Sequence, residues 1–415
     1  MLRPALLKTL ETHFGVQTLT RTQKLLISAL HSHADIIVRD MTGSGKTLGL
    51  VAAALSKSHP PGKYTNTLFL LPTRELALMV SHWAKILDPT RQIACLVHGE
   101  ATQAPPGKIV FGTARKVMEM IEAKELDVSR LQTLIIDEVD RAEPAVSRYA
   151  PISKRLVKQI HPTWTRKLVD MLVNDRKRST LSNLKRVTID EPIDTAKIKR
   201  LQIVAASATV NHPVRQMLKK SGWMHEPVFI DVNGTQYPDI KHLAYYFDSQ
   251  TGKMIPLATN DPELALESSD FPPAVADDDP RVIQGLIRLL DESQAPFAFL
   301  FANSSISTTK LVDYLNDNGV PATRLLEQLI TNPPFANIQK TRLIVATEYE
   351  ARGLDLKECK LVFILGLPAS ASSYLHMAGR TGRFGTQGTV ISVLGGKRYM
   401  PRLAQTLQKI ELKLD

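Results

Sequence analysis

Short apolar runs alternate with longer amphipathic stretches along the first half of the chain. The runs at residues 36–38, 67–71, 92–97 and 108–111 each end in a turn containing Gly, Thr or Pro. Most of these turns lead into a stretch with helical spacing of apolar residues. Strands that are buried on both faces are continuous apolar runs of this kind. The repetition of strand, turn and helix predicts an α/β fold with a doubly wound parallel sheet.

The same pattern indicates two domains. At 415 residues the chain is long enough for two units with separate cores, and the stretch 232–238, marked by Gly and Pro, is typical of a linker. We therefore expect a first domain over residues 1–231 and a second over 237–415. A basic segment at about 145–200 and an acidic, Pro-rich one at about 255–280 interrupt the pattern. The acidic segment is predicted to be a disordered surface loop.

One Gly-rich stretch, residues 40–47, lies between the apolar run 36–38 and a helix-forming stretch. Such a turn between strand and helix binds phosphates through backbone N–H groups and the helix N-terminus. Lys46 is placed to reach the β- and γ-phosphates, and Thr47 to ligate Mg²⁺. The sequence thus predicts a nucleoside triphosphate site formed by Thr42, Gly43, Ser44, Gly45, Lys46 and Thr47.

Carboxylates follow another buried apolar run, at Asp137, Glu138 and Asp140. Because parallel strands end at one edge of the sheet, these side chains are expected beside the phosphate loop. There Asp137 can hold Mg²⁺, and Glu138 can orient or deprotonate the attacking water. The two motifs together predict hydrolysis of a nucleoside triphosphate.

Other features of the sequence indicate which nucleotide and which macromolecule the protein binds. Gln23 precedes the phosphate-loop strand, where its amide can pair with an adenine edge; an ordinary surface position is the alternative for a single Gln. Thr73 and Arg74 open a helix directly after a strand, a position suited either to a phosphodiester backbone or to simple N-capping. A formal charge of +11 favours nucleic acid. Two distant cysteines exclude a disulfide framework or a zinc site.

These motifs, in this order, resemble those of the DEAD-box RNA helicases of superfamily 2, with Asp137-Glu138-Val139-Asp140 in place of the family's Asp-Glu-Ala-Asp. Similar segments extend along nearly the whole chain, at Gln23 and at residues 40–47, 72–77, 207–209, 299–304, 351–355 and 376–383. The resemblance implies two tandem RecA-like domains, parallel sheets flanked by helices with a nucleotide cleft between them. It also implies ATP and Mg²⁺ as ligands and single-stranded or locally structured RNA as the partner.

The resemblance further implies roles for individual residues. The catalytic residues would be Lys46, Asp137, Glu138, Arg380 and Arg383, the two arginines acting as fingers on the γ-phosphate. The nucleotide would contact Gln23, residues 42–47, Gly353 and Asp355. Nucleotide state would be coupled to RNA through Asp140, Ser207, Thr209 and His376. The RNA would contact Pro72, Thr73, Arg74, Gly99, Thr113, Arg115, Asn303 and Thr347.

The implied function is an ATP-dependent helicase that clamps and locally unwinds or remodels RNA, with a role in ribosome assembly as a hypothesis. Met41, Glu348 and Met377 depart from the family's usual residues, so we expect slow hydrolysis. A clamp or scaffold with little turnover stays open as the alternative, and a DNA translocase is disfavoured. The basic segment is interpreted either as an RNA-binding arm or as a solvated helix or loop.

The first residues, 1–8, are basic and apolar like an organelle transit segment, but a first amphipathic helix is the preferred interpretation. The compartment stays open between mitochondrion, nucleolus and cytoplasm, with the mitochondrion as the first candidate. No apolar run approaches the roughly 20 residues that span a bilayer. We expect a monomer that is not secreted, with a protein activator or a ribonucleoprotein particle as a further candidate partner.

Overall fold

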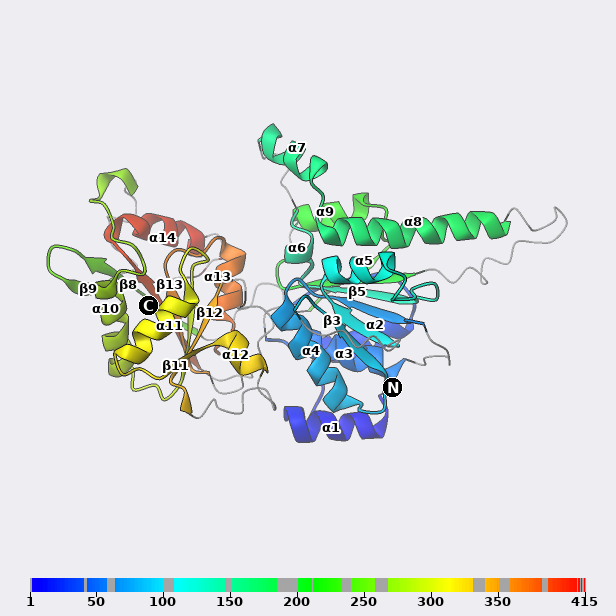
Figure 1. Cartoon of the computed structure of the whole chain (residues 1–415), viewed down its shortest axis with the longest axis horizontal. Coiled ribbons are helices and arrows are strands. Elements are labelled where there is room, and N and C mark those ends of the chain that lie inside the picture. Colours follow the sequence, from blue (N-terminus) through cyan, green and yellow to red (C-terminus); the bar gives the residue numbers. More distant parts are fainter. Residues whose placement is uncertain are drawn as a thin grey trace. The chain divides into compact units, whose positions relative to one another are not determined.

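The computed structural model divides the chain into two compact units, Met1–Thr235 and Gln236–Asp415. It describes residues 2–40, 43–57, 64–99, 108–145, 151–184, 201–210, 212–232, 240–257, 268–330, 340–348, 350, 359–382, 387–408, 410, 412 and 414. The division lies within the stretch that the sequence marks as a linker. Each unit is a sheet covered by helices (Figure 1).

The first unit is built on a seven-stranded sheet in the order β3-β4-β2-β5-β6-β1-β7. Every neighbouring pair in this sheet is parallel. The strands are β1 (Ile36–Arg39), β2 (Thr67–Leu70), β3 (Ile93–Leu96), β4 (Ile109–Gly112), β5 (Thr133–Asp137), β6 (Gln202–Ser207) and β7 (Val228–Asp231). Since all strands point the same way, the loops that follow them gather at one edge.

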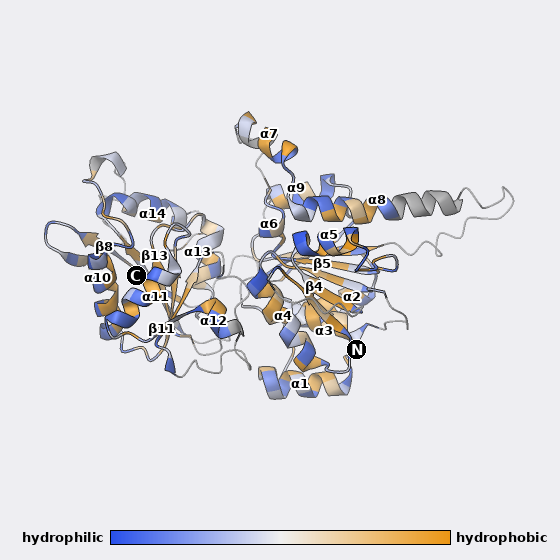
Figure 2. Ribbon diagram, in the orientation of Figure 1, coloured by the Kyte–Doolittle hydropathy of each residue, from blue (hydrophilic) through white to orange (hydrophobic). Residues whose placement is uncertain are grey.

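Helices flank this sheet because the connections between parallel strands are crossovers. The α-helices of the first unit are α1 (Pro4–Phe14), α2 (Arg21–His31), α3 (Lys46–Ser56), α4 (Arg74–Leu87), α5 (Ala114–Glu122), α6 (Val139–Ala142), α7 (Ile152–Ile160), which stands off from the sheet, α8 (Trp164–Leu184) and α9 (His212–Lys220). Figure 2 shows the hydrophobic colouring concentrated in the central strands, whereas the helices carry mixed colours. Strands β2, β4, β5 and β6 are buried along their whole length.

The first residues form the amphipathic helix that the sequence pattern predicted. Helix α1 has Pro at its N-terminal end and ends at Gly15, whose φ of 61° is in the left-handed region that favours glycine. Its buried residues are Leu6, Leu10 and Phe14, and Phe14 packs edge-on against Trp83 of α4 at 6.1 Å between ring centroids. The stretch is therefore part of the first unit's packing.

The basic segment 145–200 is partly core, so the interpretation as a solvated helix or loop is wrong for that part, and the RNA-binding arm stays a prediction. Leu168, Val169 and Leu172 of α8 belong to the hydrophobic core beside the sheet. The preceding helix, α7, instead exposes apolar side chains, among them Ile152 at 72% and Ile160 at 61%. Residues 146–150 and 185–200 lie outside the described residues.

The second unit has a seven-stranded sheet in the order β11-β12-β10-β13-β14-β8-β9. All its pairs are parallel except β8 with β9, which is antiparallel. The strands are β8 (Ile240–Asp248), β9 (Lys253–Pro256), β10 (Ala298–Ala302), β11 (Ala322–Arg324), β12 (Leu343–Thr347), β13 (Leu361–Leu365) and β14 (Gly388–Leu394). The flanking α-helices are α10 (Pro280–Glu292), α11 (Thr308–Asp317), α12 (Leu325–Ile330), α13 (Ala371–Ala378) and α14 (Met400–Gln408).

The prediction of a disordered loop at about 255–280 is wrong for the part that the structure describes. Asp277 Oδ1 accepts a hydrogen bond from Gly395 N at 2.8 Å, and Val275 N donates to Gly395 O at 3.0 Å. Burial of the Asp277 carboxyl raises its pKa, against the hydrogen bond from Gly395. Residues 268–279 thus pack against the end of β14 through defined contacts.

Within the described residues we find no helix with the length and apolar character needed to cross a bilayer.

Candidate nucleotide and nucleic-acid site

The phosphate loop connects β1 to α3 as predicted. Gly43 and Gly45 have φ values of 78° and 81°, a backbone conformation that residues with a Cβ rarely adopt. Gly45 is the N-cap of α3, so the first N–H groups of that helix point into the loop. Lys46 is buried and donates from Nζ to the backbone oxygen of Asp40 at 2.8 Å. Thr42 lies outside the described residues, as does Met41.

The carboxylate motif meets this loop directly. Strand β5 is separated from β1 only by β6, and it ends at Asp137. Thr47 Oγ1 donates a hydrogen bond to Asp137 Oδ2 at 2.6 Å. Burial and the neighbouring Glu138 raise the pKa of Asp137 to about 6, although Thr47 and Lys46 oppose the shift. The expectation that the two motifs share one sheet edge is therefore confirmed by the geometry.

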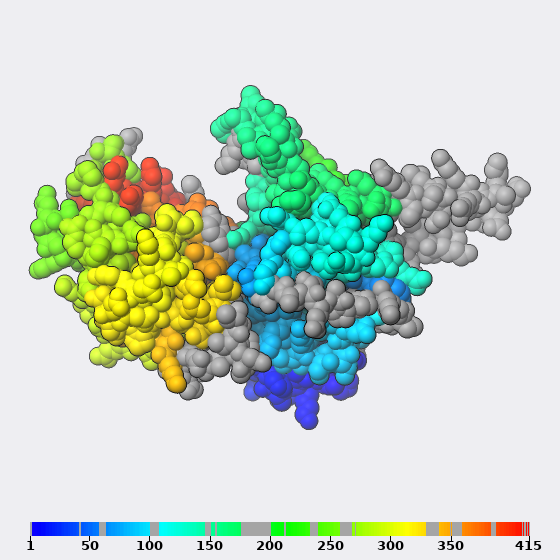
Figure 3. Space-filling view, in the orientation of Figure 1, coloured from blue at the N-terminus to red at the C-terminus, as the bar shows by residue number. Residues whose placement is uncertain are grey.

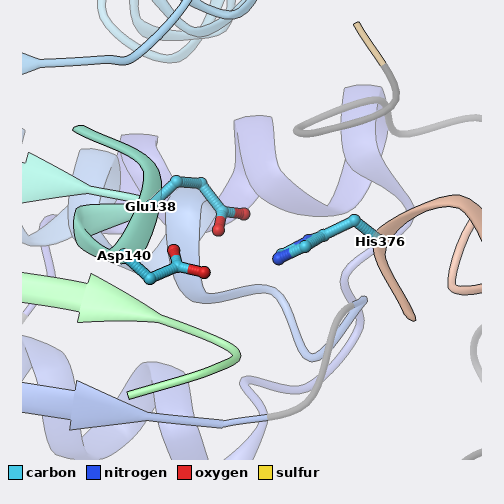
Figure 4. Close-up of side chains that lie close together, drawn as sticks. All are labelled: Glu138, Asp140 and His376. Carbon is cyan, nitrogen blue, oxygen red and sulfur yellow. The ribbon is translucent and has the colours of Figure 1, made fainter. Parts of the chain in front are cut away.

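Glu138 begins the turn after β5 in a strained conformation. Its φ of 49° and ψ of 50° are left-handed, which is uncommon for a residue with a side chain. Figure 4 shows the carboxylates of Glu138 and Asp140 projecting from this turn; His376, also drawn there, comes from α13 of the second unit.

Ser207 and Thr209 hold Asp140. At the end of β6, Ser207 Oγ donates to Asp140 Oδ1 at 2.6 Å, and Thr209 Oγ1 donates to the other oxygen of the same carboxylate. Ser207 Oγ also lies 3.4 Å from Glu138 Oε2. Because one hydroxyl has one proton, Ser207 donates it to Asp140, the nearer carboxylate, and not to Glu138. Three of the four residues predicted to couple nucleotide state to RNA, Asp140, Ser207 and Thr209, thus form one network next to Glu138.

Gln23 lies beside the phosphate loop, but its amide already has partners. Its Oε1 accepts from Thr20 N at 3.0 Å, completing a capping box at the start of α2, and its Nε2 approaches Gly45 O at 3.5 Å. In the same helix, Thr22 Oγ1 donates to the buried carboxylate of Asp40. This link between Thr22 and Asp40 was not predicted; the signal for it in the sequence is an acidic residue directly after a strand.

The residues predicted to contact RNA in the first unit converge on neighbouring strand ends. Pro72, Thr73 and Arg74 follow β2, Gly99 follows β3, and Thr113 and Arg115 follow β4. Thr73 caps α4, since Leu76 N donates to its Oγ1 at 3.3 Å, so the capping interpretation is confirmed for this residue. Gly99 has a φ of 80°, and an added Cβ there would lie 3.0 Å from Arg74 Nη1. A side chain at position 99 would therefore displace Arg74.

In the second unit, Asn303 follows β10, and Thr347 is the last residue of the adjacent strand β12. Asn303 Nδ2 donates to Leu367 O at 3.0 Å, and Thr347 Oγ1 donates to Glu350 Oε2 at 2.9 Å. Glu348, one of the departures from the family pattern, is buried and accepts a hydrogen bond from Ala369 N at 2.9 Å. Its carboxylate therefore contributes to the local packing of this unit.

Helix α13 carries the remaining described motif residues of the second unit. His376 lies within the helix, and Arg380 follows it with its Nε donating to His376 O at 2.8 Å. Gly353, Asp355 and Arg383 lie outside the described residues. The roles assigned to these residues stay predictions.

The chain matches the DEAD/DEAH box helicase family over residues 20–217 and the helicase conserved C-terminal domain over residues 282–385. It belongs to the DEAD-box helicases of superfamily 2. The recognition made from the sequence motifs is therefore confirmed.

Named relatives agree with this assignment at low identity. The chain is 24% identical over 384 residues to the ATP-dependent RNA helicase DeaD of Haemophilus influenzae, covering 88% of this chain and 51% of the relative. It is 24% identical over 417 residues to the ATP-dependent RNA helicase mak5 of Schizosaccharomyces pombe, covering 93% of this chain and 56% of the relative. The chain thus spans about half the length of these two relatives.

A solved structure shows the same fold. The S. cerevisiae Dbp5 structure bound to RNA and ADP BeF3 aligns with a TM-score of 0.68 at 19% identity, covering 99% of this chain and 91% of that one. The predicted class, two α/β units with parallel sheets flanked by helices, is confirmed.

Proposed function

We propose that this DEAD-box helicase binds ATP and single-stranded RNA, and that it uses ATP hydrolysis to remodel RNA locally. The observation that carries the proposal is the junction of phosphate loop and carboxylate strand through Thr47 and Asp137. The network of Asp140, Ser207 and Thr209 beside Glu138 supports it. The RNA and ATP assignments follow from the family of relatives named ATP-dependent RNA helicases.

The residues at this junction fit Mg²⁺. The donor set is a carboxylate from Asp137 and a hydroxyl from Thr47, which are oxygen ligands of the kind that Mg²⁺ prefers together with substrate phosphates. When bound, the ion would neutralise charge on the β- and γ-phosphates. Lys46, now donating to Asp40 O, is long enough to donate to a phosphate oxygen instead.

Glu138 is the proposed base. Its side chain starts from a turn that is fixed on one side by β5 and on the other by the Asp140 network. It would accept a proton from the water that attacks the γ-phosphorus, while backbone N–H groups of the phosphate loop hold the departing diphosphate. Arg380 keeps its proposed role as an arginine finger, which would stabilise charge on the transferring phosphoryl group.

The test is phosphate release with and without single-stranded RNA, comparing the unaltered protein with Glu138→Gln. RNA-stimulated release that is lost in the variant, with ATP binding retained, is the expected result. ATP-dependent RNA binding without ATP turnover in either protein would contradict the helicase function and favour that of a clamp or scaffold. Equal stimulation by DNA and RNA would overturn the choice of RNA.

A role in ribosome assembly is a further part of the proposal, supported by the excess of basic residues in this chain. Co-sedimentation with pre-ribosomal particles tests it, and absence from purified particles would contradict it. Location in the mitochondrion is proposed as the first compartment to examine, by imaging of a tagged full chain. A protein activator would appear as a partner in pull-downs that survive nuclease treatment, and the proposed monomer is checked by light scattering.

A further inference from the structure

One tryptophan is unusually exposed. The chain has three, Trp83, Trp164 and Trp223, and all lie in the first unit. Trp223 is only 2% exposed, and Trp83 packs against Phe14. Trp164, the first residue of α8, is 43% exposed. Tryptophan has a large apolar surface, so leaving nearly half of it in water costs free energy unless another molecule covers it.

The backbone at Trp164 is fixed by a buried carboxylate. Thr163 Oγ1 accepts from Arg166 N at 3.0 Å, capping the first turn of α8, and donates to Glu143. Glu143 is 1% exposed and also pairs with Lys158 Nζ at 2.8 Å. This carboxylate therefore joins the end of α6 to the segment that leads into α8. The hydrogen bonds of Thr163 and Glu143 therefore fix the backbone position from which the exposed Trp164 ring projects.

The packing of α8 explains why the ring faces outward. Thr165, Leu168 and Val169 are buried, and together they form the inner face of the helix's first two turns. Trp164 and Lys167 are three residues apart and share another face. Lys167 Nζ lies 4.5 Å from the centroid of the Trp164 ring. The ring and this cation thus form one surface feature.

A second cation near the Trp164 ring is Arg115, one of the residues of the first unit that are predicted to contact RNA. Arg115, at the start of α5, has its Cζ 5.6 Å from the Trp164 ring centroid, and its side chain is 59% exposed. Helices α5 and α8 pack against each other, and in Figure 3 their surfaces adjoin. Arg115 follows β4 next to Thr113, so the ring lies at the end of the row of predicted phosphate contacts.

We propose that Trp164 is a stacking platform for one nucleobase of the bound RNA, with Arg115 and Lys167 pairing with the phosphates on either side of that base. The inference rests on the proposed RNA-binding function and adds a base contact to a set of backbone contacts. Stacking needs no particular base, because every base presents a π-face. Both cations are on long side chains that can leave the ring for a phosphate, which exposes the ring further.

The test is equilibrium binding of a fluorescein-labelled oligouridylate in the presence of a non-hydrolysable ATP analogue. Trp164→Ala is expected to weaken binding about 5- to 150-fold, the range typical of losing one base–aromatic stack. Trp164→Phe is expected to retain most of the affinity, since it keeps a stacking ring. Ile152→Ala is the matched control, because it removes exposed apolar surface on α7 and is expected to leave binding unchanged.

An oligonucleotide with the same phosphates but with abasic sites separates stacking from charge. On this probe Trp164→Ala and the unaltered protein are expected to bind equally. A loss of affinity as large on the abasic probe as on oligouridylate would overturn the inference in favour of a structural role. Unchanged oligouridylate affinity in Trp164→Ala would overturn it as well, and would leave the exposed ring to a protein partner.

Fluorescence gives a readout that a structural role would not produce. Oligouridylate is expected to quench the intrinsic tryptophan emission of the unaltered protein, and the quenching is expected to be largely absent in Trp164→Phe. Failure of the proposed function has a different signature, since the unaltered protein would then bind neither probe. Quenching that persists in Trp164→Phe would contradict stacking at this residue.

Discussion

Replacing Gly49 by Ala tests whether the contact between α2 and α3 sets the position of Gln23. In an ordinary helix interior this substitution stabilises by about 1 kcal/mol, because Ala has the higher helix propensity. Here an added Cβ would lie 3.0 Å from Gln23 Cγ, 3.2 Å from Gln23 Cα and 3.3 Å from Leu26 Cδ1. Since Gln23 Cα is backbone, rotating a side chain cannot relieve the overlap, and α2 must shift by a few tenths of an ångström.

Overpacking of this kind costs about 1–3 kcal/mol, which exceeds the gain in propensity. We therefore expect Gly49→Ala to lower the free energy of unfolding of the first unit by about 1 kcal/mol. The shift also moves Gln23 Nε2 away from Gly45 O, and with it the amide that is predicted to pair with adenine. Loss of one hydrogen bond to adenine should lower the preference for ATP over GTP about 3- to 10-fold.

Unfolding in urea is followed by tryptophan emission, which reports on the first unit because all three tryptophans lie there. Nucleotide preference is measured by competition binding. Gly285→Ala is the matched control, since its Cβ would meet the Met254 side chain, which can rotate away, within the second unit. A Gly49→Ala protein that gained about 1 kcal/mol and kept its nucleotide preference would refute the reasoning.

Three further changes test other parts of the structure. A double-mutant cycle of Ser207→Ala and Asp140→Ala should give a coupling free energy of about 2 kcal/mol in urea unfolding, and additive effects would contradict the hydrogen bond between them. Burial lowers the pKa of Lys57 from 10.5 to about 8, so the folded state binds fewer protons than the unfolded state between these values. The unaltered protein should therefore gain stability relative to Lys57→Met as pH rises from about 8 towards 10.5, by about 3 kcal/mol at most, and a difference that stays flat over this range would count against the buried charge. Glu143→Gln removes the charge that pairs with Lys158. It should speed tryptic cleavage within residues 151–163 about 5-fold and leave cleavage elsewhere unchanged. Equal cleavage rates of this segment in the variant and the unaltered protein would show that the ion pair does not hold it.

The first domain was largely predictable because its motifs and its strands coincide. Continuous apolar runs marked β1, β2, β4 and β5, and the polar residues that end them, such as Asp137, had to gather at one sheet edge. The network of Ser207 and Thr209 with Asp140 was expected from the family resemblance, and the distances agree with it.

Contacts between segments distant in sequence could not be read from local pattern. The frequent charges of the basic segment indicate an RNA-binding arm or a solvated helix or loop, yet Leu168, Val169 and Leu172 pack into the core. The acidic segment near Asp277 looked disordered by composition, but the backbone of Gly395 supplies its hydrogen-bond donor. Charge and Pro content describe the solvent-facing part of such segments and say little about what their apolar residues meet.

At position 138, the residue that would give the highest folding stability differs from the residue that the proposed reaction needs, because the backbone there is left-handed. A residue with a Cβ in that conformation costs about 1 kcal/mol or more relative to glycine, which adopts it freely. A library of variants selected only for survival at high temperature should therefore enrich Gly, and to a lesser degree Asn, at position 138. Such a selection would discard the carboxylate that the proposed reaction needs, so engineering for heat resistance must exclude this position from the library.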